Sequence, residues 1–258
     1  MRTKTNSWVL AAAALAMLGT ASAQWANKKT PGVPRTADGK LNLSAPAPKL
    51  PDGKPDLSGI WNPDIKYLRN IALDLKGEVP MQPWAEALFK ERAAGLHGHE
   101  EPDANCLPQG VPKIDIAPVP WKVVHVPGQV VILYEAFTQF RQIFMDGRKL
   151  PENPNPIWLG YSVGRWEGDT LVVDSNGFNG KTWLDVDGHP STEQLRVTEK
   201  FRRPDFGHME IEITIDDPGA YTKPWTVKVA STLMVDTELL EFICGENERD
   251  VRHMGPKN

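Results

Sequence analysis

Cysteine is scarce in this sequence, and the common catalytic signatures are missing. Cys106 and Cys244 are the only cysteines among 258 residues, too few for a structural zinc site. The chain has no G-x-S-x-G elbow, no P-loop, no G-x-G-x-x-G and no H-E-x-x-H motif, which argues against α/β-hydrolase chemistry, nucleotide cofactors and zinc proteolysis. His97 and His99 lie in a glycine-rich loop, which gives them no fixed ligand geometry. We therefore expect no cofactor and no metal.

The chain also lacks a basic cluster and a long apolar run. Its formal net charge is −4, and the absence of a Lys/Arg patch argues against nucleic acid or an anionic membrane as partner. The apolar run at residues 8–18 has 11 residues, whereas a membrane-spanning helix needs about 20. We expect no membrane span, and a small-molecule substrate or ligand as the partner.

The first 23 residues have the pattern of a secretion signal. Arg2 and Lys4 precede the apolar run, and Ala21-Ser22-Ala23 is a small-x-small cleavage pattern. The pattern predicts cleavage after Ala23 and a periplasmic or secreted protein. An oxidising compartment favours a disulfide between Cys106 and Cys244. The alternative is a free Cys106 in a pocket, although no activating pair of histidines lies beside it.

Proline divides the rest of the chain. Residues 24–56 are rich in proline, lysine and glycine, a composition that buries little apolar area, so we interpret them as a tether or as an extended arm laid on the domain. Within this arm the tripeptide Asp-Gly-Lys occurs at 38–40 and again at 52–54. Residues 57–258 are predicted to form a single β-barrel-like domain with one helix near 83–95. The proline-rich stretch 102–120 is predicted to be a loop.

Short alternating runs separated by turn residues follow from residue 121. Gly59-Ile60-Trp61 opens the folded body, and Pro127-Gly128, Asp146-Gly147 and Gly168-Asp169 stand where hairpin turns are expected. The pattern predicts a mainly β fold, an antiparallel up-and-down or half-open barrel with one short N-terminal helix. The predicted strands are 121–126, 129–135, 138–145, 160–166, 170–175, 194–203, 208–215, 225–231 and 239–244.

Two resemblances accompany this pattern. The tripeptide Gly59-Ile60-Trp61 resembles the Gly-x-Trp opening of lipocalin-type (calycin) barrels, which implies a calycin-like barrel. The segments GYSVGRWEGDTLVV at 160–173, TWLD at 182–185 and EKFRR at 199–203 resemble an uncharacterised family of secreted bacterial proteins over roughly residues 51–248. That family resemblance implies no activity.

A polar side chain in the inward register of a barrel strand is a candidate for chemistry. Glu199 shares its register with Val197 and Phe201, and Arg141 shares its register with Ile143, so both are predicted to point inward. A buried carboxylate suits a general acid or base, and an inward guanidinium can hold an anion. The alternative is a structural ion pair between the two.

Other strands offer further candidates for a polar pocket. Tyr161 shares a register with Val163, and Glu241 shares one with Leu239 and Ile243. His208 begins a strand directly after a Phe-Gly turn. We consider Tyr161 an anion-stabilising residue, and His208 and Glu241 substrate-binding residues.

The connection 176–193 is unusually long, with 18 residues, and such loops tend to be functional or disordered. Trp183 could form a stacking wall for a substrate, with Asp185 orienting His189 as an acid/base pair at the barrel mouth. An EF-hand is excluded because Arg196 stands where the bidentate glutamate would be. A plain turn with a solvated His189 is the other interpretation.

These features favour a secreted enzyme that performs cofactor-free acid/base chemistry, as a lyase, isomerase or hydrolase, on an apolar or aromatic compound in a barrel pocket. The predicted catalytic residues are Glu199, His189, Asp185, Arg141 and Tyr161, and the predicted substrate-binding residues are Trp183, His208 and Glu241. One alternative is a lipocalin-like carrier of a lipophilic ligand. Another is an envelope interaction protein that works through its proline-rich arm.

Overall fold

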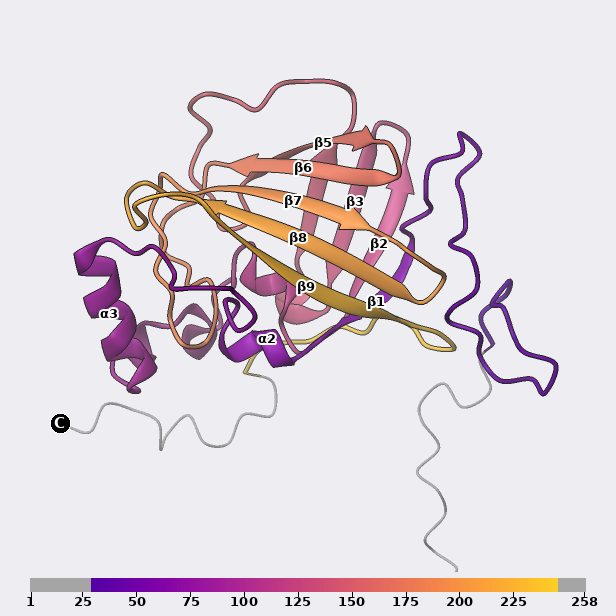
Figure 1. The fold of residues 1–258 in the computed structure, drawn as a ribbon, viewed down its shortest axis with the longest axis horizontal. Coiled ribbons are helices and arrows are strands. Elements are labelled where there is room, and N and C mark those ends of the chain that lie inside the picture. The colour runs from indigo at the N-terminus through magenta and orange to yellow at the C-terminus, as the bar shows by residue number, and fades with distance from the viewer. Residues whose placement is uncertain (1–28, 246–258) are drawn as a thin grey trace, which may run out of the picture.

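The computed structural model describes residues 29–245, and within them nine strands form a closed barrel in sequence order (Figure 1). The predicted signal peptide at 1–23 lies outside these residues. The strands are β1 (Gly59–Pro63), β2 (Trp121–Val126), β3 (Gln129–Tyr134), β4 (Phe140–Phe144), β5 (Tyr161–Glu167), β6 (Thr170–Asn176), β7 (Arg196–Arg202), β8 (His208–Asp216) and β9 (Trp225–Met234). The mainly β, calycin-like barrel predicted from the sequence is confirmed.

Neighbouring strands are antiparallel all round the barrel except for β4 and β5, which run parallel. Strict alternation cannot close a ring with an odd number of strands, so at least one parallel step is required. The prediction of a hairpin at Asp146-Gly147 is therefore wrong. Residues 145–160 instead cross from the end of β4 back to the start of β5.

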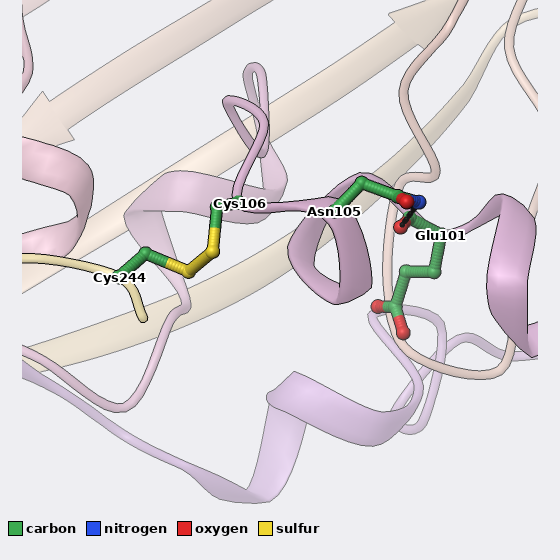
Figure 2. Close-up of a disulfide and its surroundings, with 4 residues drawn as sticks. All are labelled: Glu101, Asn105, Cys106 and Cys244. Atoms are coloured by element: carbon green, nitrogen blue, oxygen red, sulfur yellow. Dashed lines mark hydrogen bonds between the residues drawn. A yellow bond between two sulfur atoms is a disulfide. The ribbon is translucent and has the colours of Figure 1, made fainter. Parts of the chain in front are cut away.

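The predicted strand at 239–244 is also wrong. The last strand of the described chain is β9, which pairs with β8 on one side and with β1 on the other. Closure of the barrel leaves no free edge on which a further strand could form ladder hydrogen bonds. The segment after β9 is instead tied down by a disulfide between Cys244 and Cys106, with an S–S distance of 2.03 Å (Figure 2). The predicted disulfide is thus confirmed.

The two ends of the barrel differ. One end carries the tight turns between β2 and β3 and between β5 and β6, and the N-terminal arm lies near it (Figure 1). The other end carries the long connections. These include α2 (Lys66–Arg69), α3 (Pro83–Ala93) and the 3-10 turns η1 (Gly98–Glu100), η2 (Pro102–Asn105), η3 (Lys113–Asp115) and η4 (Ala136–Thr138). The helix predicted near 83–95 is therefore confirmed as α3, which ends just before Gly95, a residue with a φ of +87°.

Alternation along the strands fills the barrel. Met209, Ile211, Ile213 and Ile215 of β8 are all completely buried, and they face a core that includes Trp61 and Trp121. Burial of such side chains is the main stabilising contribution to a fold of this kind. In the described part of the chain, no helix combines the length and the apolar character needed to cross a bilayer.

The arm packs against the tight-turn end. The amide N–H of Phe206 donates to the carbonyl of Ala45, and that of Gly207 donates to Leu43. The two Asp-Gly-Lys tripeptides form matching turns, in which Gly39 N–H bonds to Thr36 and Gly53 N–H bonds to Leu50 in the same way. The described part of the arm is therefore held by backbone hydrogen bonds as well as by its own turns.

Candidate functional site

Arg141 and Glu199 meet inside the barrel. Arg141 on β4 is 2% exposed and Glu199 on β7 is 0% exposed. The guanidinium forms a two-pronged ion pair, with Nη1 donating to Oε1 at 3.1 Å and Nη2 donating to Oε2. Their inward orientation is confirmed, because the period of two along each strand places both residues in the buried register.

Two serines complete the bonds of this guanidinium. Arg141 Nε donates to Ser162 Oγ at 3.0 Å, and Nη2 donates to Ser175 Oγ at 2.9 Å. The two hydroxyl oxygens also lie 2.9 Å apart. Ser162 and Ser175 are directly opposite each other on β5 and β6, so the antiparallel register brings them together.

A second carboxyl group, which the sequence analysis missed, lies beside the ion pair. Asp115 of η3 is fully buried, its Oδ1 accepts a hydrogen bond from Tyr134 Oη at 2.7 Å, and its Oδ2 is 3.8 Å from Arg141 Nη1. Burial raises the pKa of Asp115 well above its usual value, and the negative charge of Glu199 raises it further. Both effects favour the neutral, protonated form of Asp115. Arg141, Glu199 and Asp115 together form a buried charged cluster.

The sequence carries only weak signals for Asp115 and for its hydrogen-bond partner Tyr134. Asp115 is a lone acid between Ile114 and Ile116 in a segment that resembles a loop, and Tyr134 continues the inward register of Val130 and Ile132 on β3. Burial also raises the pKa of Tyr134 well above its usual value, and the neighbouring Asp115 adds to that rise. A tyrosine inside a barrel needs a hydrogen-bond partner, but which acid supplies it depends on how the loop 102–120 folds back.

A cleft lies in the barrel wall beside this cluster. The parallel strands β4 and β5 pair only at Ile143 with Ser162 and at Phe144 with Val163, so residues 140–142 of β4 have no ladder partner on β5. The cleft has a volume of about 470 Å³. Its lining includes Arg141 and Ser162 together with four aromatic side chains, Phe140, Phe144, Trp158 and Tyr161.

Tyr161 does not point into the barrel, so the expectation that it joins an interior pocket is wrong. Its neighbour Ser162 takes the buried register of β5, which turns Tyr161 outward. The ring stacks on Phe144 with centroids 5.2 Å apart, and Arg148 Nη1 donates to the phenol oxygen at 2.9 Å. Tyr161 therefore shares the cleft with Arg141 from the outer face of the sheet.

The predicted pairing of Asp185 with His189 is confirmed as a contact. His189 Nδ1 lies 2.6 Å from Asp185 Oδ2, and Asp185 also accepts backbone N–H groups from Ile71, Gly188 and His189. The imidazole is 1% exposed and stacks on Phe89 of α3 with centroids 4.1 Å apart. It is therefore not a solvated residue at an open mouth. Among the described residues, this pair shares no hydrogen bond or ion pair with Arg141 or Glu199.

The predicted substrate-binding residues do not gather around the cluster. Trp183 is buried, and the Arg92 guanidinium lies 4.1 Å from its ring centroid, so that ring is not an open wall for a substrate. His208 is exposed at the tight-turn end, where its Nδ1 is 2.7 Å from Asp205 Oδ1. Glu241 is exposed in the segment after β9. Barrel closure at β9 removes the strand register that placed Glu241 inward.

Residues 29–245 contain no group of three or more His, Cys, Asp or Glu side chains placed to hold a metal ion. His97 is engaged by Glu100 and Glu91, with nitrogen to oxygen distances of 3.0 and 2.9 Å. Comparison with family models, with curated proteins and with solved structures yields no match for this chain.

Proposed function

We propose that this protein is an exported enzyme that moves protons on an apolar or aromatic small molecule bound in the cleft between β4 and β5, without a cofactor. The observation that supports this proposal most strongly is the shared cleft of Arg141, Ser162 and Tyr161. A buried cation, a hydroxyl group and a phenol line one hollow whose remaining walls are largely apolar and include three aromatic side chains, Phe140, Phe144 and Trp158. Such a site favours the binding of a planar, apolar small molecule that carries one polar group.

Arg141 and Ser162 are the groups that would stabilise an oxyanion or enolate formed during the reaction. Glu199 is the direct counter-charge of Arg141, and the raised pKa of Asp115 favours the neutral form of this second carboxyl group. Glu199 and Asp115 therefore act through Arg141, whose position and charge they fix. They are positioning residues in this proposal.

Tyr161 is the group placed to donate or accept the proton. Its hydroxyl receives a hydrogen bond from Arg148 Nη1, and Asp146 in turn holds Arg148. A donor aimed at the phenol oxygen supports negative charge on that oxygen while the proton is transferred. Proton transfer by Glu199 or His189, expected from the sequence, is disfavoured because neither residue lines the cleft.

The test is a screen of the mature protein against bacterial and plant metabolites, in which thermal shift detects binding and mass spectrometry detects conversion. For a converted compound, Tyr161→Phe should lower turnover by about a hundredfold or more and leave the thermal shift in place. The matched control is Tyr67→Phe on α2, which removes a hydroxyl that donates to Asp74 and should leave turnover unchanged. Conversion by Tyr161→Phe at the rate of the unaltered protein would refute the assignment.

A carrier of a lipophilic ligand is the second candidate, and one observation favours it. Arg141 already donates four hydrogen bonds within the protein, to Ser162, Ser175 and both oxygens of Glu199. A guanidinium so fully engaged has little capacity left for a reacting group. In a carrier, screened compounds would be bound and recovered unchanged, and Tyr161→Phe would alter only their affinity.

A further inference from the structure

Arg92 on α3 is a half-buried cation without a partner acid. Among residues 29–245, no carboxylate oxygen lies within 4.0 Å of its guanidinium. Burial lowers the pKa of Arg92, and the more distant charges of Glu100 and Glu101 oppose that effect. Other arginines in the fold, such as Arg141, Arg148 and Arg202, have a carboxylate in direct contact. A desolvated charge is stabilised when an anion binds beside it.

The fold fixes the position of this side chain on three sides. Its guanidinium lies over the Trp183 ring, and Nη1 donates to the carbonyl of Gly188 at 3.2 Å. Its aliphatic stem packs on Gly188, where an added Cβ would be 2.5 Å from Arg92 Cβ. Gly188 also has a φ of +92°, so this close approach depends on glycine. Arg92 therefore loses little rotamer freedom when a ligand binds.

One edge of the guanidinium is left unbonded. Nε is buried and has no hydrogen-bond partner, and Nη2 makes no hydrogen bond within the described residues. The Nε and Nη2 protons of an arginine form a parallel fork that matches the two oxygens of a carboxylate. The geometry of the unbonded edge thus fits a bidentate acid.

A cavity of about 400 Å³ lies beside Arg92, between α3 and the loop 176–193. It carries a second cation, Lys181, and the hydroxyl-bearing residues Thr182 and Ser191. Trp84 forms an aromatic wall and is 47% exposed. Glu100 is the one acid of the lining, and His97 binds its carboxylate with a nitrogen to oxygen distance of 3.0 Å.

We propose that this cavity is a second binding site, which takes a small organic acid whose carboxylate pairs with Nε and Nη2 of Arg92 and whose ring lies along Trp84. The ligand class is a ring-bearing carboxylate, either an aromatic acid or a sugar acid. The site is independent of the proposed enzyme function, because none of its residues lines the cleft between β4 and β5.

The experiment is a titration of the protein with benzoate, glucuronate and the neutral isostere benzamide, followed by calorimetry and by Trp fluorescence. We expect saturable binding of benzoate or glucuronate, and which of the two binds identifies the ring type. Benzamide should not bind, because it lacks the charge that Arg92 requires. The absence of saturable binding of both acids up to about 10 mM, or equal binding of benzamide, overturns the proposal.

Substitutions of Arg92 test whether the acid binds in this cavity. Arg92→Gln should weaken binding of the acid by about tenfold or more, and Arg92→Lys should weaken it similarly because a lysine cannot form the fork. Arg92→Lys keeps the charge beside Trp183 and serves if the glutamine variant does not fold. The matched control Arg202→Gln removes an exposed arginine paired with Glu210 on the outer face of the barrel, and it should bind like the unaltered protein. Unchanged affinity in either folded Arg92 variant refutes the assignment.

Discussion

Substitution of Glu199 by glutamine tests the charge arrangement inside the barrel. Removal of one partner of a buried ion pair usually costs about 3–5 kcal/mol, because the other charge is left uncompensated. In this protein a second carboxyl group can replace Glu199 as the partner of Arg141, because Asp115 Oδ2 lies 3.8 Å from Arg141 Nη1. The negative charge of Glu199 is one reason why the pKa of Asp115 is raised. Without that charge, Asp115 can ionise and become the counter-ion.

The expected magnitudes follow from this replacement. Glu199→Gln alone should lower the free energy of unfolding at neutral pH by about 1–3 kcal/mol. Asp115→Asn alone should cost about 1 kcal/mol, because the amide oxygen still accepts the Tyr134 hydroxyl. The double variant loses both acids and should cost at least the full value of about 3–5 kcal/mol, more than the sum of the two single effects.

The pH dependence has a definite sign. A carboxyl group whose pKa is raised by folding keeps its proton in the native state and loses it in the unfolded state above about pH 3.9. Asp115 therefore makes the free energy of unfolding fall as the pH rises from about 3.9 toward its folded pKa, by up to about 1.4 kcal/mol per pH unit. Asp115→Asn removes this contribution. Glu199→Gln removes one cause of the raised pKa of Asp115, so it narrows the pH range over which the free energy of unfolding falls.

Urea denaturation monitored by tryptophan fluorescence between about pH 5 and 8 provides the measurement. The control is Glu210→Gln, which breaks the exposed pair with Arg202 and should change stability by less than about 1 kcal/mol. Two results would refute the reasoning. One is additivity of Glu199→Gln and Asp115→Asn within about 0.5 kcal/mol. The other is an unchanged pH slope in Asp115→Asn.

Changes at three further places test the scaffold. Replacement of both Cys106 and Cys244 by serine removes a disulfide between residues that are 138 positions apart. In the chain-entropy model this should lower the free energy of unfolding by about 4–5 kcal/mol. The urea midpoint should fall, and a reductant should no longer change it. Gly160→Ala should cost about 1–3 kcal/mol in urea denaturation, since φ is +66° and the new Cβ would meet Phe178 at 2.7 Å; a neutral effect would contradict this packing. Asp185→Ala should cost about 3 kcal/mol or more by thermal denaturation, because three backbone N–H groups lose their acceptor, and Asp185→Asn should cost less.

The alternation of inward and outward side chains along a strand is a local property, so it could be predicted from the sequence. The run from Leu195 to Phe201 shows Glu199 in an apolar register, and the same argument places Arg141 inside. That argument gave the wrong strand at 239–244, because a closed barrel has no edge for it. Alternation also placed Tyr161 and Val163 correctly on the same face of their strand. The prediction that this face is the buried one was wrong, because Ser162 takes the inward register.

The sequence by itself determined the β architecture, the helix at the start of the domain, the disulfide and the inward placement of Arg141 and Glu199, since these depend on residue periodicity, turn residues and cysteine number. Only the tertiary structure decided that β4 and β5 run parallel and pair at just two positions, because strand direction at closure depends on the whole ring. It also decided that Asp115 and Tyr134 join Arg141 and that Arg92 covers Trp183. These contacts link segments far apart in the chain, and a periodic pattern carries no information about which loop returns to which strand.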